Sequence, residues 1–189
     1  IKSFAVDLLF LPGNLRRRSS FQTFWHRHFN LTKNTYEGTD ADLQMVQDLN
    51  DFDAFICGSD QIWNLDCTRG PVPPFFLSFA PNDTKKIAYA PSMSHAKFVE
   101  KNFTAEDKKI SGWLNRFDSV SVREISVAGQ FQDLTDKSIV ETLDPTLLLD
   151  LKDYRHIQAP ELQKRLKEGK YIFAYTLWPN KDMVKYIDE

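Results

Sequence analysis

The sequence predicts an α/β domain with a Rossmann-like, mostly parallel sheet. Short apolar runs typical of buried strands alternate with segments of helical spacing between residues 52 and 143. Such alternation requires crossover connections, which produce parallel strands and a sheet with helices on both faces. The 189 residues are 42% hydrophobic and 26% charged, which is ordinary for a folded globular chain and unlike a disordered one.

Two helices are expected before the first strand. Residues 15–29 place aromatic side chains at the spacing of one helical face: Phe21, Phe24, Trp25 and Phe29. Three arginines at 16–18 precede that face and form either a solvated helix start or an anion-binding patch. Residues 40–49 predict a second, short helix with Asp40 at its N-cap.

Four strands and two further helices are expected next. The strands are the apolar runs at 52–57, 87–90, 119–123 and 138–143. Residues 104–117 predict a helix between the second and third strands, because Thr104 is a suitable N-cap and apolar side chains at 110, 113, 114 and 117 share one face. Residues 126–134 predict the helix between the third and fourth strands.

A second domain is expected to begin near residue 155. Residues 151–169 are polar and helical in pattern, and an apolar strand follows at 171–177. We therefore expect an N-terminal Rossmann-like domain over 1–154, and a linker helix with the first strand–helix unit of a second domain over 155–189. The chain starts without methionine and stops in the opening turns of a predicted helix, so we expect a piece of a longer protein.

Composition and spacing argue against several classes of protein. No two of the seven glycines stand two apart, so a G-x-G dinucleotide fingerprint is absent, and no Gly-Lys pair completes a phosphate-binding P-loop. Two cysteines and four histidines show no zinc-ligand spacing, so a structural zinc site is not expected. A net charge of −2 argues against a nucleic-acid partner. No apolar stretch approaches the roughly 20 residues of a membrane span. Two cysteines without an export signal are typical of reduced thiols in a cytoplasmic protein.

The candidate site lies on the loops that follow the four predicted strands. Open α/β sheets bind ligands beyond the carboxyl ends of their strands, at a topological switch point. The first loop begins with residues 58–64, and the second contains Ser92 and His95. The third begins at Arg123 and the fourth at Asp144. We expect these side chains to share one edge of the sheet.

Five segments resemble, in order and spacing, the polysaccharide pyruvyltransferase family. They are residues 58–64, 75–77, 86–90, 121–124 and 144–148. The resemblance covers roughly residues 50–150, and its specific motif is the first, Gly-Ser-Asp-Gln-Ile-Trp-Asn. The family usually opens with a strand and an Asn-Tyr-Gly-Ala-like turn, which this chain lacks, and often has glycine near Ser94.

The resemblance implies a bacterial, cytoplasmic transferase with a two-domain, glycosyltransferase-B-like fold, of which this chain is the N-terminal half and is expected to be inactive alone. Family members move the pyruvyl or enolpyruvyl unit of phosphoenolpyruvate onto a sugar of a polysaccharide precursor, forming a ketal, in exopolysaccharide biosynthesis. The expected partner is a sugar or glycan-precursor acceptor, reached by peripheral association with a lipid-linked substrate. No cofactor is expected beyond phosphoenolpyruvate as donor substrate.

Eight residues are candidate substrate contacts: Gly58, Ser59, Asp60, Gln61, Trp63, Asn64, Ser92 and Arg123. The polar side chains suit sugar hydroxyls. Gly58 either permits a turn or close approach of a ligand, or merely ends the strand. The Trp63 ring is either a plate for a sugar or part of the core. Arg123 either binds the donor's carboxylate or phosphate with its fork, or forms a salt bridge with Glu124 or Asp144.

His95 and Asp144 are the candidate catalytic residues. Ketal formation needs a proton on the donor's methylene carbon, and an imidazole that titrates near neutrality could deliver it or accept the sugar's proton. A loop histidine bonded to backbone is the other interpretation of His95. Asp144 is the alternative base, or it simply forms an Asx-type turn before Pro145. Two other functions remain open: a sugar-nucleotide glycosyltransferase of the same fold, and a non-catalytic glycan-binding module.

Overall fold

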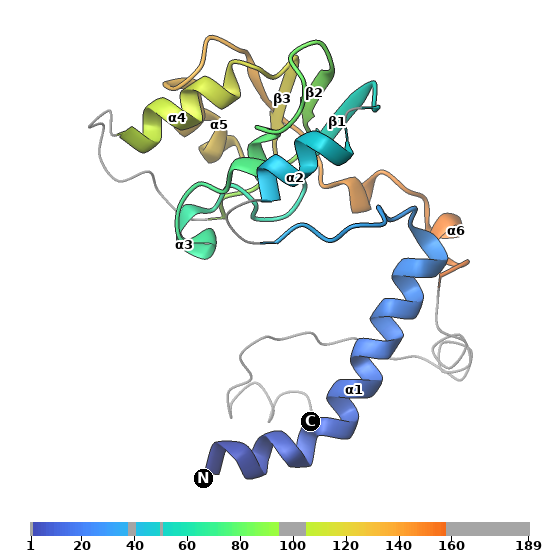
Figure 1. The fold of residues 1–189 in the computed structure, drawn as a ribbon. Coiled ribbons are helices and arrows are strands. Elements are labelled where there is room, and N and C mark those ends of the chain that lie inside the picture. The colour runs from blue at the N-terminus through green and yellow to red at the C-terminus, as the bar shows by residue number, and fades with distance from the viewer. Residues whose placement is uncertain (1, 38–40, 50, 95–104, 158–189) are drawn as a thin grey trace, which may run out of the picture.

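The computed structural model describes residues 2–37, 41–49, 51–94 and 105–157. Its strands are β1 (Ala54–Cys57), β2 (Lys85–Ala88), β3 (Ser119–Val122) and β4 (Ile139–Glu141). Its helices are α1 (Lys2–His28), α2 (Ala41–Asp48), α3 (Leu65–Thr68), α4 (Ala105–Leu114), α5 (Ile125–Gln132) and α6 (Leu151–Tyr154), with short 3-10 helices η1 (Pro73–Phe76) and η2 (Pro145–Leu147). The strands and α2–α5 form one body, from which α1 extends (Figure 1).

The four strands form one sheet in which every pair is parallel, in the order β1-β2-β3-β4. Cys57 lies opposite Ala88, Ala88 opposite Val120, and Val120 opposite Ile139. The predicted Rossmann-like α/β fold is confirmed. Because strand order follows chain order, the described strands contain no topological switch point. The candidate site therefore depends on the shared carboxyl edge of the strands alone.

The described residues cover only one face of this sheet. Phe55 and Cys57 of β1 and Val122 of β3 are buried on the covered face, whereas Ile56 and Val140 on the opposite face are 67% and 53% exposed. The expectation that helices cover both faces is thus wrong for this part of the chain. Each crossover connects a strand to its neighbour on the same side, in the order β1-β2-β3-β4. Because such crossovers are almost always right-handed, their helices then lie on the same face of the sheet.

The core beneath the covered face is centred on Trp63, whose side chain is fully buried. Its ring stacks on Phe76 with centroids 5.2 Å apart and planes 3° apart. It forms edge-to-face pairs with Phe117 and Phe131. Its indole N–H donates to the backbone carbonyl of Phe75 at 3.0 Å. The loop after β1 is therefore held against η1, α5 and the segment between α4 and β3.

The predicted elements are confirmed in type and in order within the described residues. The strand expected at 87–90 lies two residues earlier, because Ala90 adopts φ of +52° and so leaves the extended conformation. Of the helix expected over 151–169, α6 accounts for the first four residues. The boundary near 155 is untested, and the strand expected at 171–177 lies outside the described residues. Both cysteines are free, and no described helix is long and apolar enough to cross a membrane.

Candidate functional site

The loops that follow the strands run side by side beyond the carboxyl edge of the sheet. The backbone N–H of Ser92, after β2, donates to the carbonyl of Asp60, after β1, at 3.0 Å. The backbone N–H of Arg123, after β3, donates to the carbonyl of Pro91 at 3.2 Å. These hydrogen bonds continue the parallel arrangement past the ends of the strands, so side chains from three loops can meet there.

At this edge the Arg123 guanidinium lies between two carboxylates. Its Nη1 is 3.0 Å from Oδ2 of Asp144, and its Nε is 3.2 Å from Oε1 of Glu124. The three side chains are 20% to 31% exposed. The salt-bridge interpretation of Arg123 is therefore correct for both expected partners. It does not exclude contact with a ligand, because part of the guanidinium still faces solvent and Nη2 is engaged by neither carboxylate.

Two serines from other loops hold these carboxylates. Ser59 Oγ donates to Oδ2 of Asp144 at 3.0 Å, and Ser92 Oγ donates to Oε1 of Glu124 at 2.6 Å. We call these five side chains the strand-end cluster: Ser59, Ser92, Arg123, Glu124 and Asp144. Four of them are among the predicted site residues. From the sequence, Glu124 is expected only as a salt-bridge partner of Arg123. Its position directly after Arg123, at the end of a strand, is the signal that could have identified it as a site residue.

The environment of Asp144 keeps its carboxylate ionised. The hydroxyl and the backbone N–H of Thr146 donate to Oδ1 at 2.7 and 3.0 Å, and Arg123 contacts Oδ2. These hydrogen bonds hold the pKa of Asp144 well below its usual range. Partial burial opposes the charge on Arg123, but hydrogen bonds to Asp144 and Glu124 outweigh it and raise the Arg123 pKa. The Asx-type turn foreseen at Asp144 is present in its bond to the Thr146 N–H.

Glu124 differs from Asp144 in one respect. Its Oε1 accepts two hydrogen bonds, from Ser92 and Arg123, whereas its Oε2 is buried and has no hydrogen-bond partner among the described residues. A buried polar atom without a partner costs about 1–3 kcal/mol. The hydrogen bonds to Oε1 thus hold the Glu124 carboxylate in an orientation that costs free energy at Oε2.

Gly58 is required by the close approach of two loops. Its φ is +129°, and a Cβ at this position would lie 1.8 Å from the carbonyl oxygen of Tyr89, directly after β2. Only glycine adopts this backbone conformation readily and leaves that space free. The close contact expected at Gly58 is thus made by the neighbouring loop.

Three residues of the first motif do not reach the strand-end cluster. Trp63 is fully buried in the core, so its ring has no free face for a sugar, which corrects that expectation. Asn64 is 5% exposed, and its Oδ1 accepts from the backbone N–H groups of Asp66 and Cys67 as the N-cap of α3. Its Nδ2 donates to Gln61 Oε1 at 2.8 Å, which turns Gln61 toward that cap.

Of the two remaining candidates, Asp60 is among the described residues and His95 is not. The Asp60 side chain is exposed, and its Oδ1 accepts from the backbone N–H of Gln61 at 2.7 Å, so it stays open to solvent beside the cluster. His95 lies outside the described residues. Among the residues that are described, no group of three His, Cys, Asp or Glu side chains could hold a metal ion.

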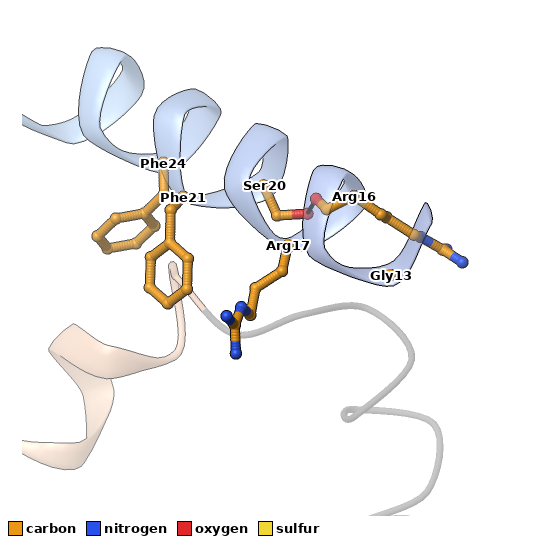
Figure 2. A pocket seen from close by; sticks show the side chains of 6 residues that line it. All are labelled: Gly13, Arg16, Arg17, Ser20, Phe21 and Phe24. Atoms are coloured by element: carbon orange, nitrogen blue, oxygen red, sulfur yellow. Dashed lines mark hydrogen bonds between the residues drawn. The ribbon is translucent and has the colours of Figure 1, made fainter. Parts of the chain in front are cut away.

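A groove of about 560 Å³ runs along α1, apart from the strand-end cluster. Its described lining is Gly13, Arg16, Arg17, Ser20, Phe21 and Phe24. Figure 2 shows Arg17, Phe21 and Phe24 projecting from one side of the helix, whereas Arg16 extends away. The groove thus places the cationic side chain of Arg17 beside the rings of Phe21 and Phe24. None of the six lining residues belongs to the strand-end cluster.

A parallel α/β sheet with charged and polar side chains gathered at the carboxyl ends of its strands defines a Rossmann-like domain of the kind that binds ligands at that edge. The family model described as polysaccharide pyruvyl transferase matches residues 5–187, and the chain belongs to this family of transferases. No curated protein and no solved structure matches the chain significantly.

Proposed function

We propose that the protein moves the pyruvyl unit of phosphoenolpyruvate onto a sugar of a polysaccharide precursor in the bacterial cytoplasm, as half of a two-domain, glycosyltransferase-B-like enzyme. Family membership supports the transferase class and a sugar acceptor. The observation that carries the donor assignment is the partly exposed Arg123 guanidinium at the carboxyl edge of the sheet. An arginine there suits a donor that carries both a carboxylate and a phosphate.

The reaction needs acid and base chemistry at the donor's double bond. A proton added to the methylene carbon makes the methyl group and leaves an oxocarbenium-like carbon, which a sugar hydroxyl attacks. A second hydroxyl then replaces the phosphate, which leaves as inorganic phosphate, and the ketal is complete. We assign proton delivery to His95 and assign proton acceptance from the sugar to Asp144. The lowered pKa of Asp144 excludes it as the proton donor, because its carboxylate stays ionised at neutral pH, although the same shift makes it a weaker base than an ordinary aspartate.

On the acceptor side, Asp60 is assigned to the sugar. The Asp60 carboxylate is exposed beside the cluster and can accept hydrogen bonds from hydroxyl groups. Phosphoenolpyruvate is the only cofactor-like molecule that this mechanism uses, and it is a substrate.

Peripheral association with a lipid-linked acceptor belongs to the same proposal. Residues 8–36 contain five Lys and Arg and no Asp or Glu, although the whole chain carries −2. Phe21, Trp25 and Phe29 in this segment are 50% to 55% exposed. Cationic side chains beside exposed aromatic rings are typical of segments that bind anionic membrane surfaces. Flotation with phosphatidylglycerol vesicles should fail when the three arginines at 16–18 are replaced by alanine, and unchanged flotation would contradict the association.

Donor competition tests the function against its two rivals. In the two-domain enzyme, we expect phosphoenolpyruvate to raise the melting temperature and to release phosphate when acceptor is added, and we expect neither effect in an Arg123→Ala variant. Protection by a UDP- or GDP-sugar alone would instead identify a glycosyltransferase. Acceptor binding without phosphate release would identify a glycan-binding module. A Glu141→Gln variant is the matched control, because Glu141 lies at the end of β4 and its carboxylate accepts from the Ile125 N–H instead of contacting Arg123.

A further inference from the structure

The Arg123 guanidinium is held by two hydrogen bonds to different nitrogens, which together determine its plane. A single bond from Nη1 to Asp144 would leave the group free to turn about that contact. The second bond, from Nε to Glu124, removes this freedom. Arginine side chains have many rotamers, so an unrestrained guanidinium would sample many orientations.

Glu124 can hold Nε only because Ser92 holds Glu124. The Ser92 hydroxyl donates to Oε1 of Glu124 at 2.6 Å and accepts from the backbone N–H of Ser94 at 2.9 Å. Its own backbone N–H is bonded to the carbonyl of Asp60, and the residue is fully buried. Ser92 is thus held both by its backbone and by its side chain. Through its hydrogen bond to Glu124, it restrains the partly exposed side chains of Glu124 and Arg123.

From these contacts we propose that Ser92 and Glu124 are positioning residues for Arg123, which they orient so that Nη2 meets the anionic donor. This inference rests on the proposed function. It also narrows the expected mode of binding: with Nε and one N–H of Nη1 already bonded to carboxylates, the donor is contacted through the N–H groups of Nη2. The buried, unpartnered Oε2 of Glu124 supports a role beyond stability, because a partly exposed ion pair contributes little to folding and this one includes a local cost.

Two variants separate orientation from charge. Ser92→Ala removes the hydroxyl and leaves every charge in place. Glu124→Asp keeps the charge but withdraws the carboxylate by one methylene, and Glu124 is exposed enough to tolerate the change if Ser92→Ala does not fold. Ser78→Ala is the matched control, because Ser78 Oγ donates to the Asp42 carboxylate at 2.7 and 2.8 Å outside the cluster.

The direct measurement is the nuclear magnetic resonance signal of the Arg123 Nε–H, assigned by its disappearance in Arg123→Lys. We expect a slowly exchanging Nε–H in the unmodified protein and in Ser78→Ala, and fast exchange or loss of the signal in Ser92→Ala and Glu124→Asp. An unchanged signal in both of these variants would overturn the proposal whatever the enzyme's activity.

Kinetics then link orientation to the donor. Because misplacement by about 1 Å can cost on the order of 100-fold in rate, we expect kcat/KM for phosphoenolpyruvate to fall about 10-fold in Ser92→Ala, with the acceptor KM unchanged. In an Arg123→Lys background, which keeps measurable activity but has no Nε–H for Glu124 to hold, Ser92→Ala should have no further effect. A loss that persists there, or that Ser78→Ala reproduces, would contradict positioning through Arg123. Changed Nε–H exchange in a protein that never consumes phosphoenolpyruvate would support the positioning and refute the proposed donor.

Discussion

Ser59 and Asp144 stand 85 positions apart in the chain, yet the Ser59 hydroxyl donates to the Asp144 carboxylate at 3.0 Å. They follow β1 and β4, which are the first and last strands of the four-stranded order. Neighbouring strands lie about 4.8 Å apart, so these two strands are separated by about 14 Å. A hydrogen bond between their loops requires both loops to bend inward over the ends of β2 and β3. The strand-end cluster is the result.

Asp144→Asn should destabilise the protein in a pH-dependent way. The pKa of Asp144 in the folded protein lies below its ordinary value of 3.8, so its contribution to the free energy of unfolding is complete above that pH and is lost as pH falls through the folded pKa. The difference between the unmodified protein and the variant should therefore be largest at pH 6 and shrink below about pH 4. Urea denaturation from pH 3 to 7 measures it, and a constant difference would contradict the assigned pKa shift.

Arg123→Lys should impair the use of donor more than it lowers stability. A lysine ammonium keeps the charge but cannot bond Glu124 and Asp144 through separate nitrogens of one rigid plane. Each charged hydrogen bond contributes about 1.5–3 kcal/mol, so kcat/KM for phosphoenolpyruvate should fall on the order of 10- to 100-fold. The melting temperature should fall little, because the ion pairs are partly exposed. Unchanged donor kinetics in a folded variant would remove Arg123 from the donor site.

Trp63→Phe should lower stability without changing the KM of either substrate. Phenylalanine can keep the stacking on Phe76 but loses the hydrogen bond to the Phe75 carbonyl and leaves part of the indole volume empty. Trp63→Ala, which removes the whole ring, should cost about 3–5 kcal/mol of unfolding free energy. Chemical denaturation and acceptor kinetics check both variants. A raised acceptor KM in a Trp63→Phe protein of unchanged stability would restore the sugar-binding interpretation.

Gly58→Ala should disturb the carboxyl edge as a whole. The new Cβ would overlap the Tyr89 carbonyl, and a backbone at φ of +129° is strained for alanine. We expect a loss of more than about 1 kcal/mol of unfolding free energy, together with weaker protection by phosphoenolpyruvate in thermal denaturation. Gly70→Ala is a useful comparison, because Gly70 also has positive φ, at +116°, but has open space around its Cβ position. Equal losses in the two variants would show that backbone strain, and not the close approach to Tyr89, makes Gly58 necessary.

The sequence by itself determined the elements and the edge at which the candidate site lies. The 3.6-residue period of α4 and the short apolar runs are local signals, and local signals decide whether a segment is a helix or a strand. The predicted caps Asp40 and Thr104 lie outside the described residues. The rule that ligands meet the carboxyl ends of parallel strands then selected the loops that hold Ser59, Ser92, Arg123 and Asp144. Both salt-bridge partners of Arg123 were foreseen on the same basis.

Only the tertiary structure decided which side chains of those loops meet. Trp63 and Ser59 stand four residues apart in one loop, yet one is the centre of the core and the other reaches Asp144. The role of Glu124 depends on Ser92, 32 positions earlier. Such pairings follow from strand order and from the way loops bend over the sheet, and these depend on contacts between distant segments, which no short stretch of sequence encodes alone. The placement of the described helices on one face has the same origin, because the three crossovers between the described strands all lead in one direction.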